Sequence, residues 1–284
     1  MITEAEIRRL AARWQTDPMI LDLDYSLGWF LAALFATPRA SQKLCFKGGT
    51  CLRKCYFRGY RFSEDLDFTA RSYVSPDDLT DWVGQTVGWS VDRGGPDFLA
   101  GPYRFETVED EYGKETYQIR VYFRGPLRWG GSPRAIRLDV TGDEILLLPT
   151  VSRSIIQPYS DSDEFSGVKV SCYSLLEILS EKVRAICGQR RFAISRDLYD
   201  IHRLVQSGLL VQDLVPLLAD KFQSRGVDIS LLEVSLLERR RREYELDWIR
   251  NLDYLIPDSD VVTFEEAWQS TIRMISQAQR MINW

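Results

Sequence analysis

The sequence predicts an α/β fold class, with strands and helices in the N-terminal part and helices alone in the C-terminal part. Residues 116–123 and 135–141 alternate apolar and polar side chains as strands do. Glycine and proline separate the helical segments of the C-terminal part. Apolar residues recur there at helical spacing in the segments 174–188, 195–206, 211–224, 230–250 and 263–282. We therefore predict two domains, residues 1–172 and residues 173–284.

The N-terminal domain is expected to open with two helices. Thr3 and Glu6 have capping-box spacing, so a helix begins here and ends near residue 15. Asp17-Pro18 begins a second helix, whose apolar residues indicate a buried position. The most apolar run, residues 26–36, is too short to span a bilayer, and no signal-peptide pattern is present. The expected location is the cytoplasm, with no membrane partner.

The next elements surround a pair of glycines. Residues 44–47 form a short strand that leads into a turn at Gly48-Gly49. Thr50 has the side chain of an N-cap for a short helix through residue 56. Further along, we expect a strand at 66–69, a helix at 76–89 and mostly irregular chain over 142–172.

The composition limits the chemistry that the chain can perform. Its 284 residues are 45% apolar and 27% charged, which gives a core large enough to need no disulfides. The five cysteines include no CxxC pair, so we expect buried, reduced thiols. Cys51 and Cys55 are four residues apart, and a metal ion shared between them stays open as an alternative. The single histidine, His202, excludes a multi-histidine metal site and argues against a His-based triad.

Charge is unevenly distributed along the chain, although the net charge is −5. Residues 120–137 contain five arginines and no acid, and residues 181–203 contain six basic residues and three acids. Residues 239–242 are four consecutive arginines. Local basic faces on an acidic protein fit an enzyme that attracts a polyanion to one side. The alternative is that these residues form solvated helix faces and internal ion pairs.

Two carboxylates lie two residues apart in a predicted strand. Asp65 and Asp67 therefore point to the same face, where a cation between them would relieve their repulsion. In residues 134–140, Ile136, Leu138 and Val140 share one face, so Asp139 lies on the opposite, polar face. Asp139 could complete a metal site with the first pair, or it could be a solvent-facing side chain on a half-exposed sheet.

The glycine pair is suited to phosphate. A tight turn before a helix N-terminus exposes backbone N–H groups and the positive end of the helix dipole. Gly48 and Gly49 let the backbone approach a ligand closely. The segment lacks the GxxxxGK[ST] pattern, and no GxGxxG follows a strand, so neither a P-loop nor a dinucleotide fold is indicated.

The stretch FKGGTCLRKCYFRGYRFSEDLDF resembles the signature of the AbiEii/AbiGii-type nucleotidyltransferase toxins. These toxins are a branch of the DNA polymerase β-like nucleotidyltransferase superfamily and act in type IV toxin–antitoxin systems. IRLDV occupies the position of the third carboxylate strand, and SLLEILSEKVRAI followed by RDLYDI resembles the helical motifs of the family. The resemblance implies a nucleotidyltransferase domain with a mixed sheet, followed by an all-helical domain.

The resemblance also implies roles for single residues. Asp65, Asp67 and Asp139 would hold Mg²⁺ or Mn²⁺ and act in catalysis. Lys182 and Asp197 would serve nucleotide binding and transfer, with Asp200 competing for the position of Asp197. Alternatively, Lys182 is an ordinary exposed lysine and Asp197 part of a helix N-terminal ion pair. The nucleotide would be bound by Lys47, Gly48, Gly49, Thr50, Ser63 and Lys182.

The function that the resemblance implies is transfer of an NMP from an NTP to RNA. The expected acceptor is the 3′ end of tRNA, so that translation is blocked in toxin–antitoxin or phage-defence activity. A cognate antitoxin is a possible protein partner. Transfer to a protein or small molecule is the first alternative, and metal-dependent nuclease activity or binding without catalysis are the others.

Overall fold

The computed structural model describes residues 1–109, 115–258 and 261–282. The chain divides into two compact units. The first contains Met1–Asp143 and Thr150–Cys172, together with Pro257 and Asp258. The second contains Glu144–Pro149 and most of the chain from Tyr173 onward. The chain thus enters the second unit briefly at Glu144–Pro149, before it completes the first.

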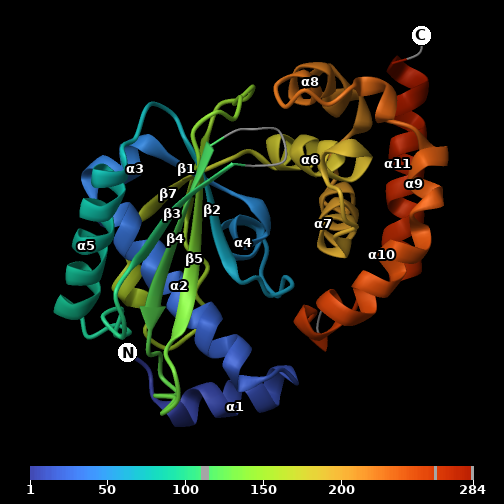
Figure 1. Cartoon of the computed structure of the whole chain (residues 1–284). Helices are drawn as coiled ribbons and strands as arrows, with labels where there is room; N and C mark the ends of the chain where they lie inside the picture. The colour runs from blue at the N-terminus through green and yellow to red at the C-terminus, as the bar shows by residue number, and fades with distance from the viewer. Residues whose placement is uncertain (110–114, 259–260, 283–284) are drawn as a thin grey trace. The chain divides into compact units, whose positions relative to one another are not determined.

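A seven-stranded mixed sheet lies in the first unit (Figure 1). Its strand order is β3-β4-β5-β2-β1-β7-β6. Strand β2 is central, and it pairs antiparallel with β1 and parallel with β5. The strands are β1 (Leu44–Lys47), β2 (Asp65–Ala70), β3 (Arg104–Glu109), β4 (Glu115–Phe123), β5 (Arg134–Thr141), β6 (Val151–Ser154) and β7 (Lys169–Cys172). The α/β class predicted from the sequence is confirmed.

One face of the sheet is covered by helix α2 (Pro18–Ala36), which packs in turn against α5 (Pro76–Asp92). Phe35 of α2 contacts Phe68 of β2, so the apolar side of β2 faces this helix. Helix α2 is long and apolar enough to pass a membrane-span test, but 83% of its most apolar window is buried inside the protein. Its apolar surface is therefore accounted for by the core. Helices α1 (Glu4–Trp14) and α3 (Pro38–Lys43) complete this part.

The predicted cap of the helix after β1 was wrong. Helix α4 (Gly48–Cys51) begins at Gly48, and Lys47 occupies its N-cap position without a side-chain hydrogen bond. The Thr50 hydroxyl, inside the helix, donates instead to the backbone carbonyl of Asp65. Because Gly48 adopts a φ of +77°, the chain can turn from the strand into the helix three residues earlier than a threonine cap would allow. Thr50 thereby ties α4 to the start of β2.

The basic residues after α4 are structural. In the π-helical turn η1 (Leu52–Tyr56), Arg53 Nε and Lys54 Nζ lie 2.6 and 2.9 Å from the carboxylate of Asp24 in α2. Tyr159 donates a further hydrogen bond of 2.8 Å to Asp24. Burial would raise the pKa of Asp24, but the charges of Arg53 and Lys54 lower it below its ordinary value. These buried pairs fix the segment that joins the glycine turn to β2.

The second unit is helical, as predicted. Glu177 accepts hydrogen bonds from the backbone amides of Leu147 and Leu148 and lies 2.6 Å from Lys221 Nζ. Arg184 binds both carboxylate oxygens of Glu144 at 2.9 Å. Its elements are α6 (Leu175–Arg184), η3 (Ala185–Gln189), α7 (Ser195–Gln206), α8 (Val211–Gln223), η4 (Ile229–Leu231), α9 (Val234–Arg239), α10 (Arg241–Asp247), η5 (Trp248–Leu252), η6 (Asp253–Leu255) and α11 (Phe264–Ile282). Buried ion pairs thus attach Glu144–Pro149 to this unit.

Two expectations about local structure need correction. Residues 142–172 are mostly irregular, as predicted, although they also contain β6, β7 and the 3-10 turn η2 (Ser162–Phe165). The predicted helix over 230–250 is divided into η4, α9, α10 and η5. Strand β3 was missed, because all six of its residues are polar or half-exposed at the edge of the sheet and give little alternation.

Candidate active site

Three carboxylates meet on two adjacent parallel strands. Asp65 and Asp67 lie two residues apart on β2, and both side chains point away from the face that α2 covers. Strand β5 pairs with β2 so that Asp139 lies directly opposite Asp67 and Arg137 directly opposite Asp65. The sheet register therefore brings together the three predicted metal ligands.

Arg137 partly neutralises these carboxylates. Its guanidinium Nη2 lies 2.6 Å from Asp65 Oδ2, and its Nε lies 3.4 Å from Asp139 Oδ2. Its positive charge offsets part of the negative charge of Asp65 and Asp139. Sequence reasoning did not assign a role to Arg137, although its position two residues before Asp139 placed it on the same face.

Asp139 is partly buried beside the other carboxylates, and its pKa is shifted. Burial and the neighbouring charge of Asp67 together raise the pKa of Asp139 to about 6, although Arg137 opposes the change. Its Oδ1 atom is buried and has no hydrogen-bond partner among the described residues. A buried carboxylate oxygen without a donor is costly unless a proton or a cation binds it.

The glycine turn lies against the same carboxylates. Lys47, at the end of β1, is paired in register with Asp67, and Gly48 follows it. A Cβ atom at Gly48 would overlap Oδ2 of Asp67, and a Cβ atom at Gly49 would overlap the guanidinium of Arg61. No side chain other than hydrogen fits at either position without displacing a neighbour. The turn and the carboxylates are thus in contact, as their spacing in the sequence predicted.

Ser63 and Thr50 differ in their positions. Ser63 is buried and precedes β2 by two residues. Thr50 is also buried, and its hydroxyl is occupied by the carbonyl of Asp65. Ser63 stays a candidate for ligand contact, whereas the side chain of Thr50 has a structural partner.

The chemistry of the carboxylate cluster fits a divalent cation. Mg²⁺ and Mn²⁺ prefer oxygen ligands, and Asp65, Asp67 and Asp139 supply only oxygens. The closeness of the three carboxylates and the buried Oδ1 of Asp139, which has no partner among the described residues, both favour a cation at this position. With the glycine turn beside it, the cluster can hold a metal-bound polyphosphate.

Lys182 lies in the second unit, in a network of its own. Its Nζ is 2.6 Å from Asp197 Oδ1 and 2.9 Å from Asp200 Oδ2, and both carboxylates are buried. Arg190 Nε approaches the other oxygen of Asp197 at 2.8 Å. Burial would raise the pKa of Asp197, but Arg190 and Lys182 lower it. Lys182 therefore pairs with both candidate aspartates and does not distinguish between them.

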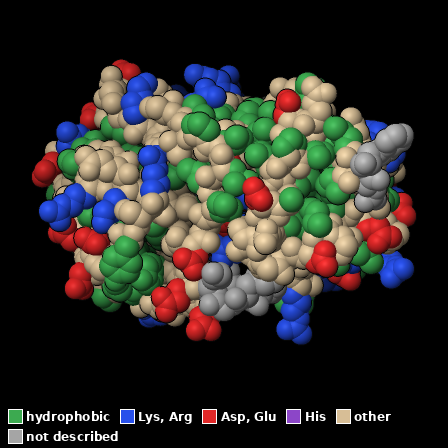
Figure 2. All heavy atoms as spheres, turned by 90° about the horizontal axis from the view of Figure 1, so that it is seen from above, with side chains coloured by type: hydrophobic (Ala, Val, Ile, Leu, Met, Phe, Trp, Pro, Cys, Tyr) green, Lys and Arg blue, Asp and Glu red, His purple; other side chains and the backbone are tan. Residues whose placement is uncertain are grey.

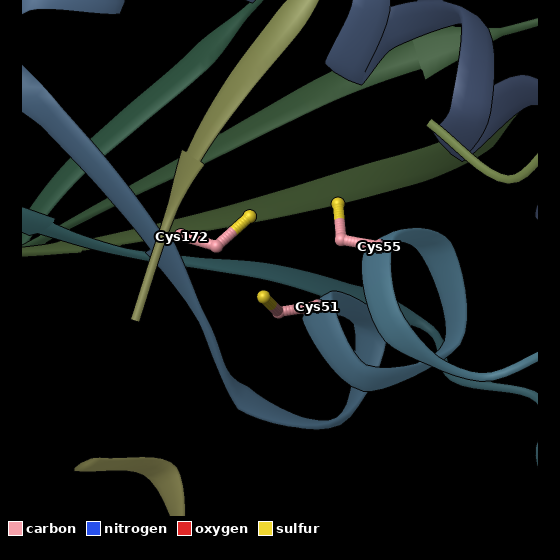
Figure 3. A group of neighbouring side chains, drawn as sticks. All are labelled: Cys51, Cys55 and Cys172. Carbon is pink, nitrogen blue, oxygen red and sulfur yellow. The ribbon is translucent and has the colours of Figure 1, made fainter. Parts of the chain in front are cut away.

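Three cysteine side chains converge near the glycine turn. The sulfur atoms of Cys51, Cys55 and Cys172 all lie within 4.8 Å of one another (Figure 3). Cys51 and Cys55 belong to α4 and η1, and Cys172 to β7. All five cysteines are free and buried, as predicted. Cys172 is a third thiol that the sequence did not associate with the other two, but the described part of the chain adds no fourth ligand to this group.

Most of the basic runs are engaged in ion pairs. Arg240, Arg241 and Arg242 each pair with a glutamate at 3.2, 2.5 and 2.5 Å. In the segment 181–203, Lys182, Arg184 and Arg190 pair with acids. On the face seen in Figure 2, acidic and basic side chains are interspersed. The alternative interpretation of these two runs, internal ion pairing, therefore accounts for most of their charge.

The fold is that of known nucleotidyltransferases. It is similar to MenT4, a nucleotidyltransferase toxin from Mycobacterium tuberculosis H37Rv, with a TM-score of 0.66 and 21% identity over 99% of this chain and 93% of that one. It is also similar to a putative nucleotidyltransferase from H. pylori, with a TM-score of 0.54 and 15% identity over 94% and 97% of the two chains. A search of curated proteins found no match.

The family is defined by a sequence profile. Residues 29–277 match the profile described as "Nucleotidyl transferase AbiEii toxin, Type IV TA system". The chain therefore belongs to the AbiEii family of nucleotidyltransferase toxins of type IV toxin–antitoxin systems. This confirms the resemblance drawn from the glycine and carboxylate motifs, and with it the class of enzyme.

Proposed function

We propose that this nucleotidyltransferase moves an NMP from an NTP to RNA, at the 3′ acceptor end of tRNA, and so blocks translation in the cytoplasm. The observation that carries the proposal is the direct pairing of Asp67 with Asp139 beside the glycine turn. That arrangement suits nucleotidyl transfer, because cations and phosphate groups would meet on one face of the sheet.

Each part of the site has a defined task in this proposal. Asp65, Asp67 and Asp139 hold Mg²⁺ or Mn²⁺, which supplies neutralising charge to the triphosphate when bound. The backbone of Gly48 and Gly49 lies close to the phosphates because neither residue has a side chain. Lys47 and Ser63 flank the same site and contact the nucleotide. Thr50 contributes through its backbone, because its hydroxyl is bonded to Asp65.

The reaction is an in-line displacement. The 3′ oxygen of the acceptor forms a bond to the α-phosphorus of the NTP, and the bond to the pyrophosphate group breaks. Asp139 is the candidate acceptor for the hydroxyl proton, because burial raises its pKa from the ordinary value toward neutrality. Pyrophosphate leaves with the electron pair of the broken bond.

We also propose that Lys182 binds the nucleotide phosphates. Its two buried aspartates keep the ammonium charged and limit its movement. Asp197 and Asp200 act on the substrate through Lys182 and are positioning residues. The family also implies an antitoxin as protein partner.

The experiment that tests the proposal uses each of the four α-labelled NTPs with Mg²⁺, total tRNA and the purified protein. We expect label at the 3′ end of tRNA, mapped by nuclease digestion, and no label when EDTA replaces Mg²⁺. Label in protein instead of RNA would support the first alternative acceptor. RNA that is shortened without any NTP would support a nuclease.

A further inference from the structure

Four side chains form a row across four adjacent strands in the first unit. Asp65 of β2 is opposite Arg137 of β5, Arg137 is opposite Arg120 of β4, and Arg120 is opposite Arg104 of β3. Cross-strand partners point to the same face of a sheet, so the three arginines lie on the face that carries the carboxylates. The row leads from the candidate metal site to the edge of the sheet.

Within the described residues, the outer two arginines differ from Arg137 in having no acidic partner. Arg137 pairs with Asp65 and Asp139, but no ion pair with Arg120 or Arg104 occurs in residues 1–109 and 115–258. Arg104 is exposed and lies over the ring of Tyr122, with 5.6 Å between its guanidinium carbon and the ring centroid. Like charges directly opposite one another destabilise a sheet, so an anion from outside is the partner that this row lacks.

Other arginines of the same segment do not share this position. Arg134 donates to the backbone carbonyl of Met19, and Arg124 donates to that of Trp129. Both interactions stabilise the chain around the β4–β5 connection. Of the five arginines in residues 120–137, Arg120 and Arg137 belong to the row, with Arg104 beside Arg120, and Arg128 is exposed in the β4–β5 connection.

We propose that Arg104 and Arg120 bind the phosphate backbone of the acceptor RNA, so that its terminal nucleotide lies at the carboxylates. This rests on the proposed function, because it assumes that the site transfers an NMP to RNA. Strands are 4.7–4.9 Å apart, so the row extends about 14 Å from Asp65 to Arg104. One polynucleotide strand presents several phosphates over that length, at about 3.4 Å of rise each.

Two neighbours define what kind of nucleic acid fits. Tyr122 shares the face with Arg104 and Arg120, and its ring offers a stacking surface for an unpaired base. Glu106 lies opposite Gln118 in the next row and disfavours phosphate on that side. The row therefore fits a single-stranded end, with its backbone on the arginines and one base on Tyr122, better than the side of a duplex.

The test compares an Arg104→Ala/Arg120→Ala double variant with an Arg39→Ala/Arg93→Ala double variant. The control removes the same charge from α3 and from the end of α5. It also removes a matching cation–π contact, because Arg93 lies over Trp89. Binding is measured with fluorescently labelled tRNA without NTP over a range of salt, and transfer is measured with tRNA and labelled NTP.

For the row variant we expect KM for tRNA to rise roughly tenfold, with kcat and the affinity for Mg²⁺–NTP within about twofold of wild type. The slope of log K against log salt should fall by about 1.4, for two lost contacts to a single strand. If the row variant matched the control while wild type labelled tRNA, the inference would be overturned and the proposed function would stand. If wild type bound tRNA through the row but transferred nothing to it, the proposed function would fail alone.

Discussion

Asp67 and Asp139 lie directly opposite each other on neighbouring parallel strands, although 71 other positions of the chain separate them. The two carboxylates repel each other, and the charge of Asp67 contributes to the raised pKa of Asp139, which Arg137 opposes. The repulsion is retained in the folded protein, which is unusual unless a ligand relieves it. The predictions below follow from this relationship and from the glycine turn and ion pairs around it.

Asp67→Asn should abolish transfer. The amide keeps the shape of the side chain but removes a charged oxygen ligand, and loss of several kcal/mol of transition-state stabilisation lowers the rate roughly 10³-fold or more. The rate of labelled NMP transfer and the thermal stabilisation by Mg²⁺–NTP are the measurements. Asp92→Asn, at the exposed end of α5, is the control and should behave as wild type. Wild-type activity of the Asp67 variant would remove the metal site from the mechanism.

Asp139→Asn should stabilise the metal-free protein while it abolishes transfer. The folded-state pKa of Asp139, about 6, is above its ordinary 3.8, so the native state binds more protons than the unfolded state between these values. The corresponding stability is present below pH 4 and is lost as pH rises through 6. The variant should therefore be more stable than wild type at pH 7, by roughly 3 kcal/mol.

Urea unfolding in EDTA from pH 4 to pH 8 measures this difference directly. The gap between Asp139→Asn and wild type should be small at pH 4, close to the ordinary pKa of 3.8, and should open as the pH rises through 6. A gap that stays the same at all these pH values would show that the Asp139 carboxyl is not perturbed.

Gly48→Ala should weaken nucleotide and metal binding. The residue has a φ of +77°, and the added methyl group would overlap the Asp67 carboxylate. Gly94→Ala is the matched control, since Gly94 has a φ of +64° but open space around its Cα. Both variants should lose about 1 kcal/mol of stability to backbone strain. Only Gly48→Ala should also lose affinity for Mg²⁺–NTP in calorimetry, and equal losses in the two would argue against contact between turn and carboxylate.

Lys182→Met should destabilise the second unit by about 3–5 kcal/mol, because it leaves Asp197 and Asp200 without their shared cation. Loss of activity in this variant alone would therefore not distinguish a role of Lys182 in nucleotide binding from a role in stability. Lys182→Met combined with Asp200→Asn removes one charge of each sign and should recover much of the lost melting temperature. If the double variant is stable but inactive, Lys182 acts on the nucleotide; recovery of activity together with stability would make its role structural.

The five cysteines should react slowly with a thiol reagent in the folded protein. All are buried, and burial raises the pKa of Cys45 to about 11 and that of Cys187 to about 12. Five equivalents should react promptly in denaturant. Rapid reaction of one thiol without denaturant would show that the cysteine group near the glycine turn opens to solvent.

The sequence predicts those parts of the site that depend on local periodicity. Strand alternation places Asp65 with Asp67, and the same alternation puts Asp139 on a polar face. Which strands become neighbours is decided by non-local packing, so the register that pairs Asp67 with Asp139 required the structure. The row of arginines could not be predicted from the sequence for the same reason, because Arg104 lies in a strand that the sequence pattern did not indicate.

Other features of the sequence were compatible with two different local structures. Thr50 has N-cap chemistry, but the left-handed conformation of Gly48 starts the helix earlier and leaves the hydroxyl to bond Asp65. Asp197 and Asp200 are three residues apart on one helix, and Lys182 reaches both. A basic run in a sequence gives no information about its partners, and only the folded chain shows that Arg184 is bound to Glu144.

The brief passage of Glu144–Pro149 through the second unit constrains how this protein can be divided or recombined. Glu144 holds Arg184 and Arg225, and the amides of Leu147 and Leu148 hold Glu177. A chain cut after Cys172 would keep one half of these pairs and lose the other, leaving charged groups unmatched. A chimera that exchanges the helical region between relatives would therefore need to take two separate segments from the same parent, this short loop and the helices that it contacts.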